Sequence, residues 1–137
     1  MPPEAQGRPQ GLPGLKAVYG CVPASFAPLS DAGGPITVQA LLENIIQAAD
    51  VFTTSPLIAQ HHLVTLADPL NNFPAQPVIP LMRTDRVAEK AVEVLNDVSA
   101  SLTTEDLVML NERASGSNKE NPKDVAKTLL KEKGFDR

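Results

Sequence analysis

Proline and charge are divided unevenly along this chain of 137 residues, and that division limits the folds open to it. Residues 1–82 contain 12 of the 13 prolines and only 7 charged residues, whereas residues 83–137 contain 21 charged residues and one proline. Proline lacks a backbone N–H and breaks helix interiors, so the first part is expected to form short strands and turns. The second part is expected to form amphipathic helices with solvated polar faces.

Three short apolar runs predict buried strands in the first part, at residues 48–52, 62–66 and 78–82, and a fourth candidate strand covers residues 25–29. Polar clusters follow the first two runs, at residues 53–55 and 71–76. In an open α/β sheet, loops at the carboxyl ends of strands form the ligand crevice. The predicted class is therefore α/β, with a binding site at these strand ends.

Two helices are expected before the apolar runs, after an irregular lead-in at residues 2–11. The first covers residues 11–19 and stops at Gly20, and the second covers about 36–43. The turn ahead of the second helix contains Gly33 and Gly34. These glycines either allow close backbone approach to a ligand or supply the positive φ of the turn.

Three further helices are expected after the runs. The first covers residues 86–98, and the second runs from a capping sequence at residues 103–106 to about residue 114. A polar linker follows at residues 115–120. The third helix has Asn121 as its N-cap, Pro122 in its first position and Gly134 as its terminator.

Several function classes are excluded by composition. A net charge of −4 and a pI near 5.1 argue against nucleic acid and anionic membranes, both of which require basic patches. The single Cys21 cannot form an internal disulfide, and adjacent His61 and His62 on a strand would point to opposite faces. With no G-x-S-x-G elbow either, no catalytic residue, metal ligand or cofactor is predicted, and the chain is not expected to be an enzyme.

The run DVFTTSPLIAQHHLVTLADPLNNFPAQPVIPLMR, at residues 50–83, resembles a known family. It is similar to the substrate-binding proteins of ABC importers for quaternary ammonium solutes, of the glycine betaine, choline and carnitine type. The matching motifs are a strand ending in F-T/S-T-D-x-x-I, a strand reading L-V-V-L-x-D-P, and an F-P-x-Y/Q-x-x-x-P-L-V-R segment. The likeness extends upstream through GRPQGLPGL at residues 7–15 and downstream through KEKGF at residues 131–135.

The resemblance implies a type II periplasmic-binding-protein plan, in which two α/β lobes trap the solute between them. Residues 1–76 would form most of ligand-binding lobe two, a short mixed sheet flanked by helices. Residues 77–85 would be the hinge return strand, and residues 86–137 the C-terminal helices of lobe one. The rest of lobe one, and a signal peptide, would lie outside this chain. The parent protein would act outside the cytoplasmic membrane, periplasmic or lipid-anchored, and deliver a zwitterionic osmoprotectant to an ABC permease.

The resemblance also implies the site residues. Arg8 stands where the family places its carboxylate-binding arginine. Without the resemblance, Arg8 would be interpreted as a surface residue of the irregular lead-in. Phe52 stands at an aromatic cage position, and Phe73 and Gln76 lie in the F-P-A-Q segment. The hydroxyls of Thr53 and Thr54 either contact the solute or cap the following turn.

The cage departs from the family pattern at two positions, because Val38 and Gln76 stand where other members often carry Tyr. With one tyrosine in the chain, a multi-tyrosine cage is not available here. The carboxylate contact is therefore expected to dominate recognition, and the solute itself is not identified.

A different class of function is the alternative: a small α/β interaction or oligomerisation module with no small-molecule ligand. The apolar helix faces in residues 86–137 would, on the two-lobe plan, pack on strands that this chain does not contain. Exposed apolar surface usually finds a partner. The chain is therefore expected to self-associate, as a homodimer that exchanges its C-terminal helices.

Overall fold

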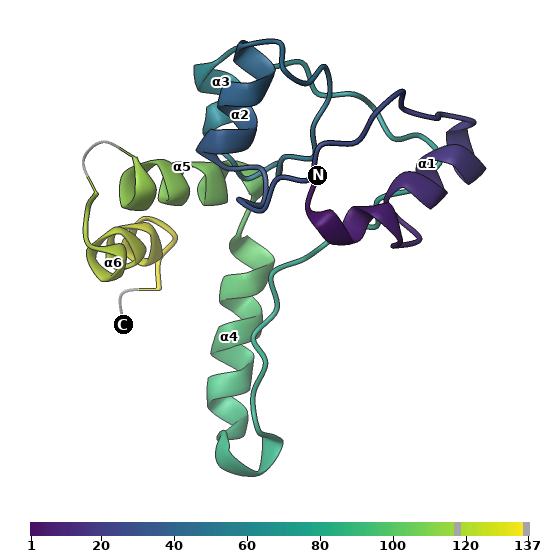
Figure 1. Cartoon of the computed structure of the whole chain (residues 1–137). Helices are drawn as coiled ribbons and strands as arrows, with labels where there is room; N and C mark the ends of the chain where they lie inside the picture. Colours follow the sequence, from purple (N-terminus) through teal and green to yellow (C-terminus); the bar gives the residue numbers. More distant parts are fainter. Residues whose placement is uncertain (117–118, 136–137) are drawn as a thin grey trace. The chain divides into compact units, whose positions relative to one another are not determined.

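The computed structural model describes residues 1–116 and 119–135, which divide into two compact units, Met1–Ala75 and Gln76–Arg137. Figure 1 traces the helices of both units along the chain. Every regular element among the described residues is helical.

The first unit contains four short helices: η1 (Pro3–Gln6), α1 (Leu12–Tyr19), α2 (Pro35–Leu42) and α3 (Leu57–Gln60). The helices predicted at residues 11–19 and 36–43 are confirmed as α1 and α2. The irregular lead-in contains a 3-10 turn, η1, and α3 was not predicted. Few side chains are buried in this unit, chiefly Ala5, Thr37, Val38 and Ala40.

Gly20 ends α1 in the way its position in the sequence predicts. It adopts the left-handed conformation, with φ of 64°, and its N–H donates to the carbonyl of Lys16 at 3.0 Å. The N–H of Cys21 then donates to the carbonyl of Leu15 at 3.0 Å. The chain reverses here, so residues 21–23 return beside α1.

The second unit contains η2 (Thr84–Arg86), α4 (Glu89–Ser101), α5 (Thr104–Ser115) and α6 (Pro122–Glu132). The three predicted helices are confirmed. α4 begins three residues later than predicted, because η2 forms a separate turn and Val87 and Ala88 are extended. Of the predicted linker at residues 115–120, residues 117 and 118 lie outside the described residues.

The predicted N-terminal caps of α5 and α6 are present in the structure. The hydroxyl of Thr103 accepts from Asp106 N at 3.2 Å, while Thr103 N donates to Asp106 Oδ2 at 2.8 Å. The Asn121 side chain accepts from Lys123 N at 3.0 Å. α6 packs on α5 and buries Val125 and Leu129, which supply the core of this unit.

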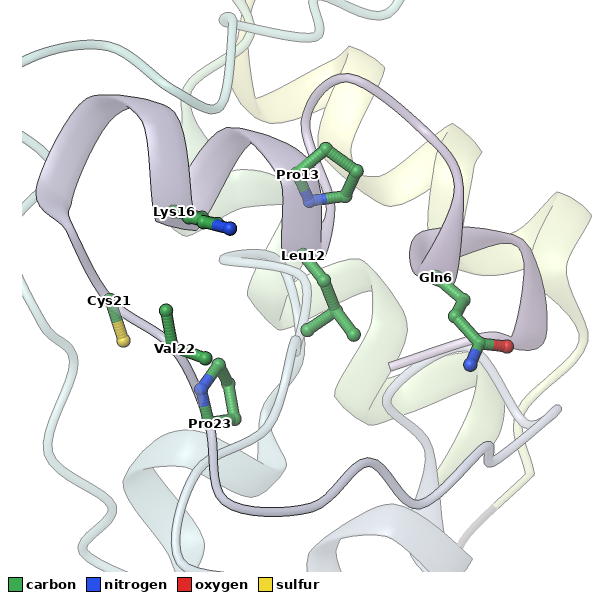
Figure 2. A pocket seen from close by; sticks show the side chains of 7 residues that line it. All are labelled: Gln6, Leu12, Pro13, Lys16, Cys21, Val22 and Pro23. Atoms are coloured by element: carbon green, nitrogen blue, oxygen red, sulfur yellow. The ribbon is translucent and has the colours of Figure 1, made fainter.

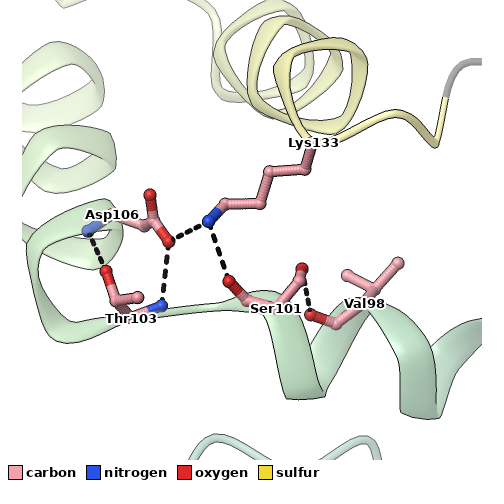
Figure 3. A network of polar contacts seen from close by, with 5 residues as sticks. All are labelled: Val98, Ser101, Thr103, Asp106 and Lys133. Carbon is pink, nitrogen blue, oxygen red and sulfur yellow. Dashed lines mark hydrogen bonds and ion pairs between the residues drawn. The ribbon is translucent and has the colours of Figure 1, made fainter.

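Lys133, just after α6, bonds to the junction between α4 and α5 (Figure 3). Its ammonium group donates to the carbonyl of Ser101 at 2.8 Å and lies 2.6 Å from Asp106 Oδ2. Because Asp106 also belongs to the capping box, one carboxylate joins the start of α5 to the end of α6.

The predicted α/β class, with a type II periplasmic-binding-protein-like mixed sheet, is wrong for this structure: the described residues contain no strand. A strand exists only through a ladder with a neighbour, and local bonds consume the donors that a ladder would need. In the run at residues 62–66, His62 N and Leu63 N donate to the carbonyls of Ala59 and Ile58, closing α3.

The other predicted strands also lack a ladder with a neighbour among the described residues. After the run at residues 48–52, the carbonyl of Phe52 accepts from Ser55 N in a turn. The run at residues 78–82 carries Pro80 and follows Pro74 and Pro77, so its backbone lacks donors at every third position. In residues 25–29 a single bond, from Leu29 N to the carbonyl of Met1, takes the place of a ladder.

Candidate functional site

Asp68 organises a loop at residues 68–73, called the Asp68 loop from here on. Its Oδ1 accepts from Asn72 N at 3.0 Å and from the hydroxyl of Tyr19, and its Oδ2 accepts from Phe73 N at 2.8 Å. The Tyr19 hydroxyl in turn accepts from Leu70 N at 3.0 Å. The last residue of α1 therefore holds the Asp68 loop.

These hydrogen bonds stabilise the ionised carboxylate. The bond from Tyr19, followed by that from Phe73 N, lowers the pKa of Asp68 below its ordinary value. Desolvation and the same hydrogen bond raise the pKa of Tyr19. At neutral pH the pair is thus an aspartate accepting from a neutral phenol.

Asn72 joins the Asp68 loop to the lead-in loop, residues 7–11. The Asn72 side chain is buried, and its amide nitrogen donates to the carbonyl of Gln10 at 3.0 Å. Both loops also meet α1 at Gly14, where an added Cβ would lie 2.1 Å from Pro9 O and 2.2 Å from Asn72 Oδ1. A glycine is therefore required at this position.

Two of the predicted site residues lie on these joined loops. Arg8 is in the lead-in loop, where it is exposed and forms no ion pair with any described residue. Its backbone is held, since Arg8 N donates to Glu4 O at 3.1 Å and its carbonyl accepts from Gly11 N at 2.9 Å. Phe73 ends the Asp68 loop with its ring partly exposed. The structure brings their two backbone segments together.

Phe52, Thr53 and Thr54 lie in a second cluster of the same unit. Phe52 is exposed, Thr53 is exposed and Thr54 is half-buried, within the turn closed by Ser55 N. The turn that precedes α2 lies against the backbone just before Phe52. An added Cβ on Gly33 would lie 2.7 Å from Asp50 O.

Asp31 holds that glycine turn at the start of α2. Its Oδ2 accepts from Thr37 N at 3.0 Å and its Oδ1 accepts from the Thr37 hydroxyl. The hydroxyl bond is the main reason that the pKa of Asp31 is lowered. Gly33 has φ of 75°, so of the two roles predicted for the glycine pair, positive φ is observed here, together with a close approach to the chain's own backbone.

Gln76 is exposed and is the first residue of the second unit, so the structure does not gather it with the other five in one unit. Val38, at a position where the family often carries Tyr, is buried in α2 at 2% exposure. A side chain buried to this extent serves the core and is not open to a ligand.

Asp68 and Tyr19 were not predicted to hold the site, and Asn72 was predicted only as part of the polar cluster at residues 71–76. One signal was present: an Asp-Pro pair followed by two asparagines favours a turn closed by a side-chain carboxylate. Asp68 bonds to Tyr19, 49 residues away, and Asn72 bonds to Gln10, 62 residues away. No local pattern in the sequence indicates bonds over such separations.

The described residues contain no group of three or more His, Cys, Asp or Glu side chains arranged to hold a metal ion. His61 and His62 are both exposed. In the described part of the chain, no helix combines the length and apolar character needed to cross a bilayer.

Comparison with known families identifies the chain. Residues 1–132 match the family model for the substrate binding domain of the ABC-type glycine betaine transport system. The chain belongs to this family. The match spans both units and confirms the resemblance first drawn from the motifs. No curated protein and no solved structure matched the chain.

Membership in the family defines the general role. The family is a non-enzymatic component of transport, and it supports a solute-binding role for this chain in an ABC transporter. Its partners are a small-molecule ligand and an ABC permease, and proteins of this family work outside the cytoplasm.

Proposed function

We propose that this chain captures glycine betaine or a related quaternary ammonium osmoprotectant for import. The observation that carries the proposal is the family match over residues 1–132. In support of it, Arg8 is the only arginine in residues 1–82, and its guanidinium has no ion-pair partner among the described residues. A planar guanidinium of this kind binds carboxylates through paired, charge-assisted hydrogen bonds.

In this proposal the two clusters of the first unit contact opposite ends of the solute. Arg8 binds the carboxylate, while Phe52 offers its ring face to the ammonium group by cation–π attraction. Thr53, Thr54 and Phe73 line the remaining contact surface, and the role of Gln76, in the second unit, stays a prediction from the resemblance. Phe52 and Phe73 are 58% and 41% exposed, which fits side chains that a ligand would cover.

Titration calorimetry tests the role of Arg8. Arg8→Ala is expected to lower glycine betaine affinity by about 1.5 to 3 kcal/mol, the range for hydrogen bonds to charged groups. Arg86→Ala, at an exposed arginine of the second unit, is the matched control. Wild-type affinity in Arg8→Ala would contradict the assignment.

Choline provides a second arm of the same experiment, because it carries the ammonium group without the carboxylate. With Val38 buried and Gln76 in place of an aromatic residue, the cage is weak and the anionic contact should dominate. Choline is therefore expected to bind less tightly than glycine betaine and to be insensitive to Arg8→Ala. Equal or tighter choline binding would show that the cage carries recognition.

An interaction or oligomerisation module remains the second candidate, favoured by the exposure of Ile79 and Leu81, at 73% and 98%. Ligand-dependent melting separates the two. A solute that binds only the folded state at 100 times its Kd raises the free energy of unfolding by about 2.7 kcal/mol. No stabilisation by any quaternary ammonium solute would favour the module.

A further inference from the structure

An open cavity of about 360 Å³ lies beside α1, and its lining residues are exposed apart from the half-buried Leu12 (Figure 2). Its walls are Gln6 of η1, three side chains of α1 (Leu12, Pro13 and Lys16), and the segment at residues 21–23. The volume is within the range of small-molecule pockets, which begins near roughly 300 Å³. None of these side chains belongs to the proposed solute site.

Backbone contacts hold both walls of the cavity. On one side, the turn at Gly20 directs residues 21–23 back along α1, and Cys21 N is bonded to the Leu15 carbonyl at 3.0 Å. On the other, η1 packs directly on the start of α1, since an added Cβ on Gly11 would lie 1.9 Å from Ala5 O. The cavity is thus formed by the fold itself.

The cavity is separate from the lead-in loop, which carries Arg8, and from the Asp68 loop. Figure 2 shows Leu12 and Lys16 projecting from α1 between the segment at residues 21–23 and Gln6. Gly14, which contacts Asn72, is two positions from Leu12 and so lies roughly 200° around the helix from it. α1 therefore presents one side to the candidate solute site and another to the cavity.

The lining combines apolar walls with a single charge. Leu12, Pro13, Val22 and Pro23 are apolar, and Lys16 is the only ionised side chain in the lining. Lys16 forms no ion pair with any described residue. An apolar cavity with one unpaired cation is complementary to a small molecule that has an apolar body and one anionic group.

We propose that this cavity binds a small unbranched monocarboxylate, with its carboxylate on Lys16 and its chain against Leu12, Val22 and Pro23. The site is independent of the proposed osmoprotectant function, because the two share no residue. Glycine betaine is a poor fit to this cavity, since its cationic end would lie against an apolar wall that has no aromatic ring.

Cys21 makes the proposal testable, because it is the only thiol in the chain, is exposed and lines the cavity. The rate at which iodoacetamide, a neutral reagent, alkylates Cys21 in the full chain is measured against octanoate concentration. Octanoate is expected to slow the reaction in a saturable way, and 1-octanol to require a roughly tenfold higher concentration for the same protection. The apparent Kd comes from the concentration dependence, so a change in the basal reaction rate does not affect it.

Lys16→Gln is the decisive variant and is expected to raise the apparent Kd for octanoate roughly tenfold while leaving that for 1-octanol unchanged. Lys131→Gln is its matched control, since Lys131 is also exposed and lies in the last turn of a helix, α6. An absence of protection by octanoate would overturn the proposal. The proposal would also be overturned if 1-octanol protected Cys21 as well as octanoate does. The same holds if Lys131→Gln raised the apparent Kd for octanoate as much as Lys16→Gln.

Discussion

Gly14 shows how one residue without a side chain holds the candidate solute site together. Alanine forms helices better than glycine by about 1 kcal/mol, so propensity alone would favour a substitution in α1. Steric overlap opposes an alanine at this position, because the new Cβ would lie 2.1 Å from the Pro9 carbonyl oxygen and 2.2 Å from Asn72 Oδ1. The Pro9 carbonyl belongs to the backbone, so relieving the overlap must displace the lead-in loop that carries Arg8.

Gly14→Ala is therefore expected to lower the free energy of unfolding by about 1 to 3 kcal/mol in chemical denaturation, the usual cost of overpacking. Gly7→Ala is the control, since nothing lies within 4 Å of its Cβ position, and it should stay within about 0.5 kcal/mol of wild type. Amide hydrogen exchange at residues 7–11 should become faster in Gly14→Ala only. Unchanged stability and exchange would contradict the proposed role of Gly14.

At the scale of elements, the second unit depends on the carboxylate that joins α5 to α6. Asp106 caps α5 and pairs with Lys133, and both side chains are mostly buried, at 18% and 22% exposure. The bond from Lys133, ahead of that from Thr103 N, lowers the pKa of Asp106 from its ordinary value of 3.8. Because the folded state favours the ionised form, this carboxylate stabilises the fold above the ordinary pKa, and its contribution is lost as the pH falls through the lower, folded value.

Acid titration of stability tests this junction. The free energy of unfolding of the wild type should fall more steeply below about pH 4 than that of Asp106→Asn, which has no charge to lose. Asp97→Asn, at an exposed aspartate of α4, should follow the wild-type slope. Parallel curves for wild type and Asp106→Asn would mean that the Lys133 pair does not stabilise the fold.

At the scale of the whole molecule, exposed apolar side chains are the main feature. Val64, Leu66, Val78, Ile79 and Leu81 are all more than 60% exposed. Apolar surface of this kind costs roughly 25 cal/mol per Å² while it stays in water. The earlier expectation of self-association, through exchanged C-terminal helices, stays a prediction.

Light scattering is expected to show a mass that rises with concentration toward that of a dimer. The Asp106–Lys133 pair tests whether helices are exchanged, using Asp106→Lys and Lys133→Glu, each of which places like charges together. If α6 is the exchanged helix, both pairs become attractive again in a heterodimer of the two variants, so mixing them should restore association and stability. A monodisperse monomer with a cooperative melt would contradict self-association, and a mixture that behaves as the sum of its parts would contradict exchange of α6.

The sequence by itself indicated the five longer helices and the family, but not α3. Gly20, the Thr103 capping box and the Asn121-Pro122 pair act within one helical turn of their own position, so local residue types are enough to locate those helix ends. Only the tertiary structure decided two other features. The apolar runs formed no strands, because a strand requires a ladder with a partner elsewhere in the chain and none forms among the described residues. Arg8 and Phe73 came onto joined loops through Asn72, whose partner lies 62 residues away, a distance at which no local pattern carries information.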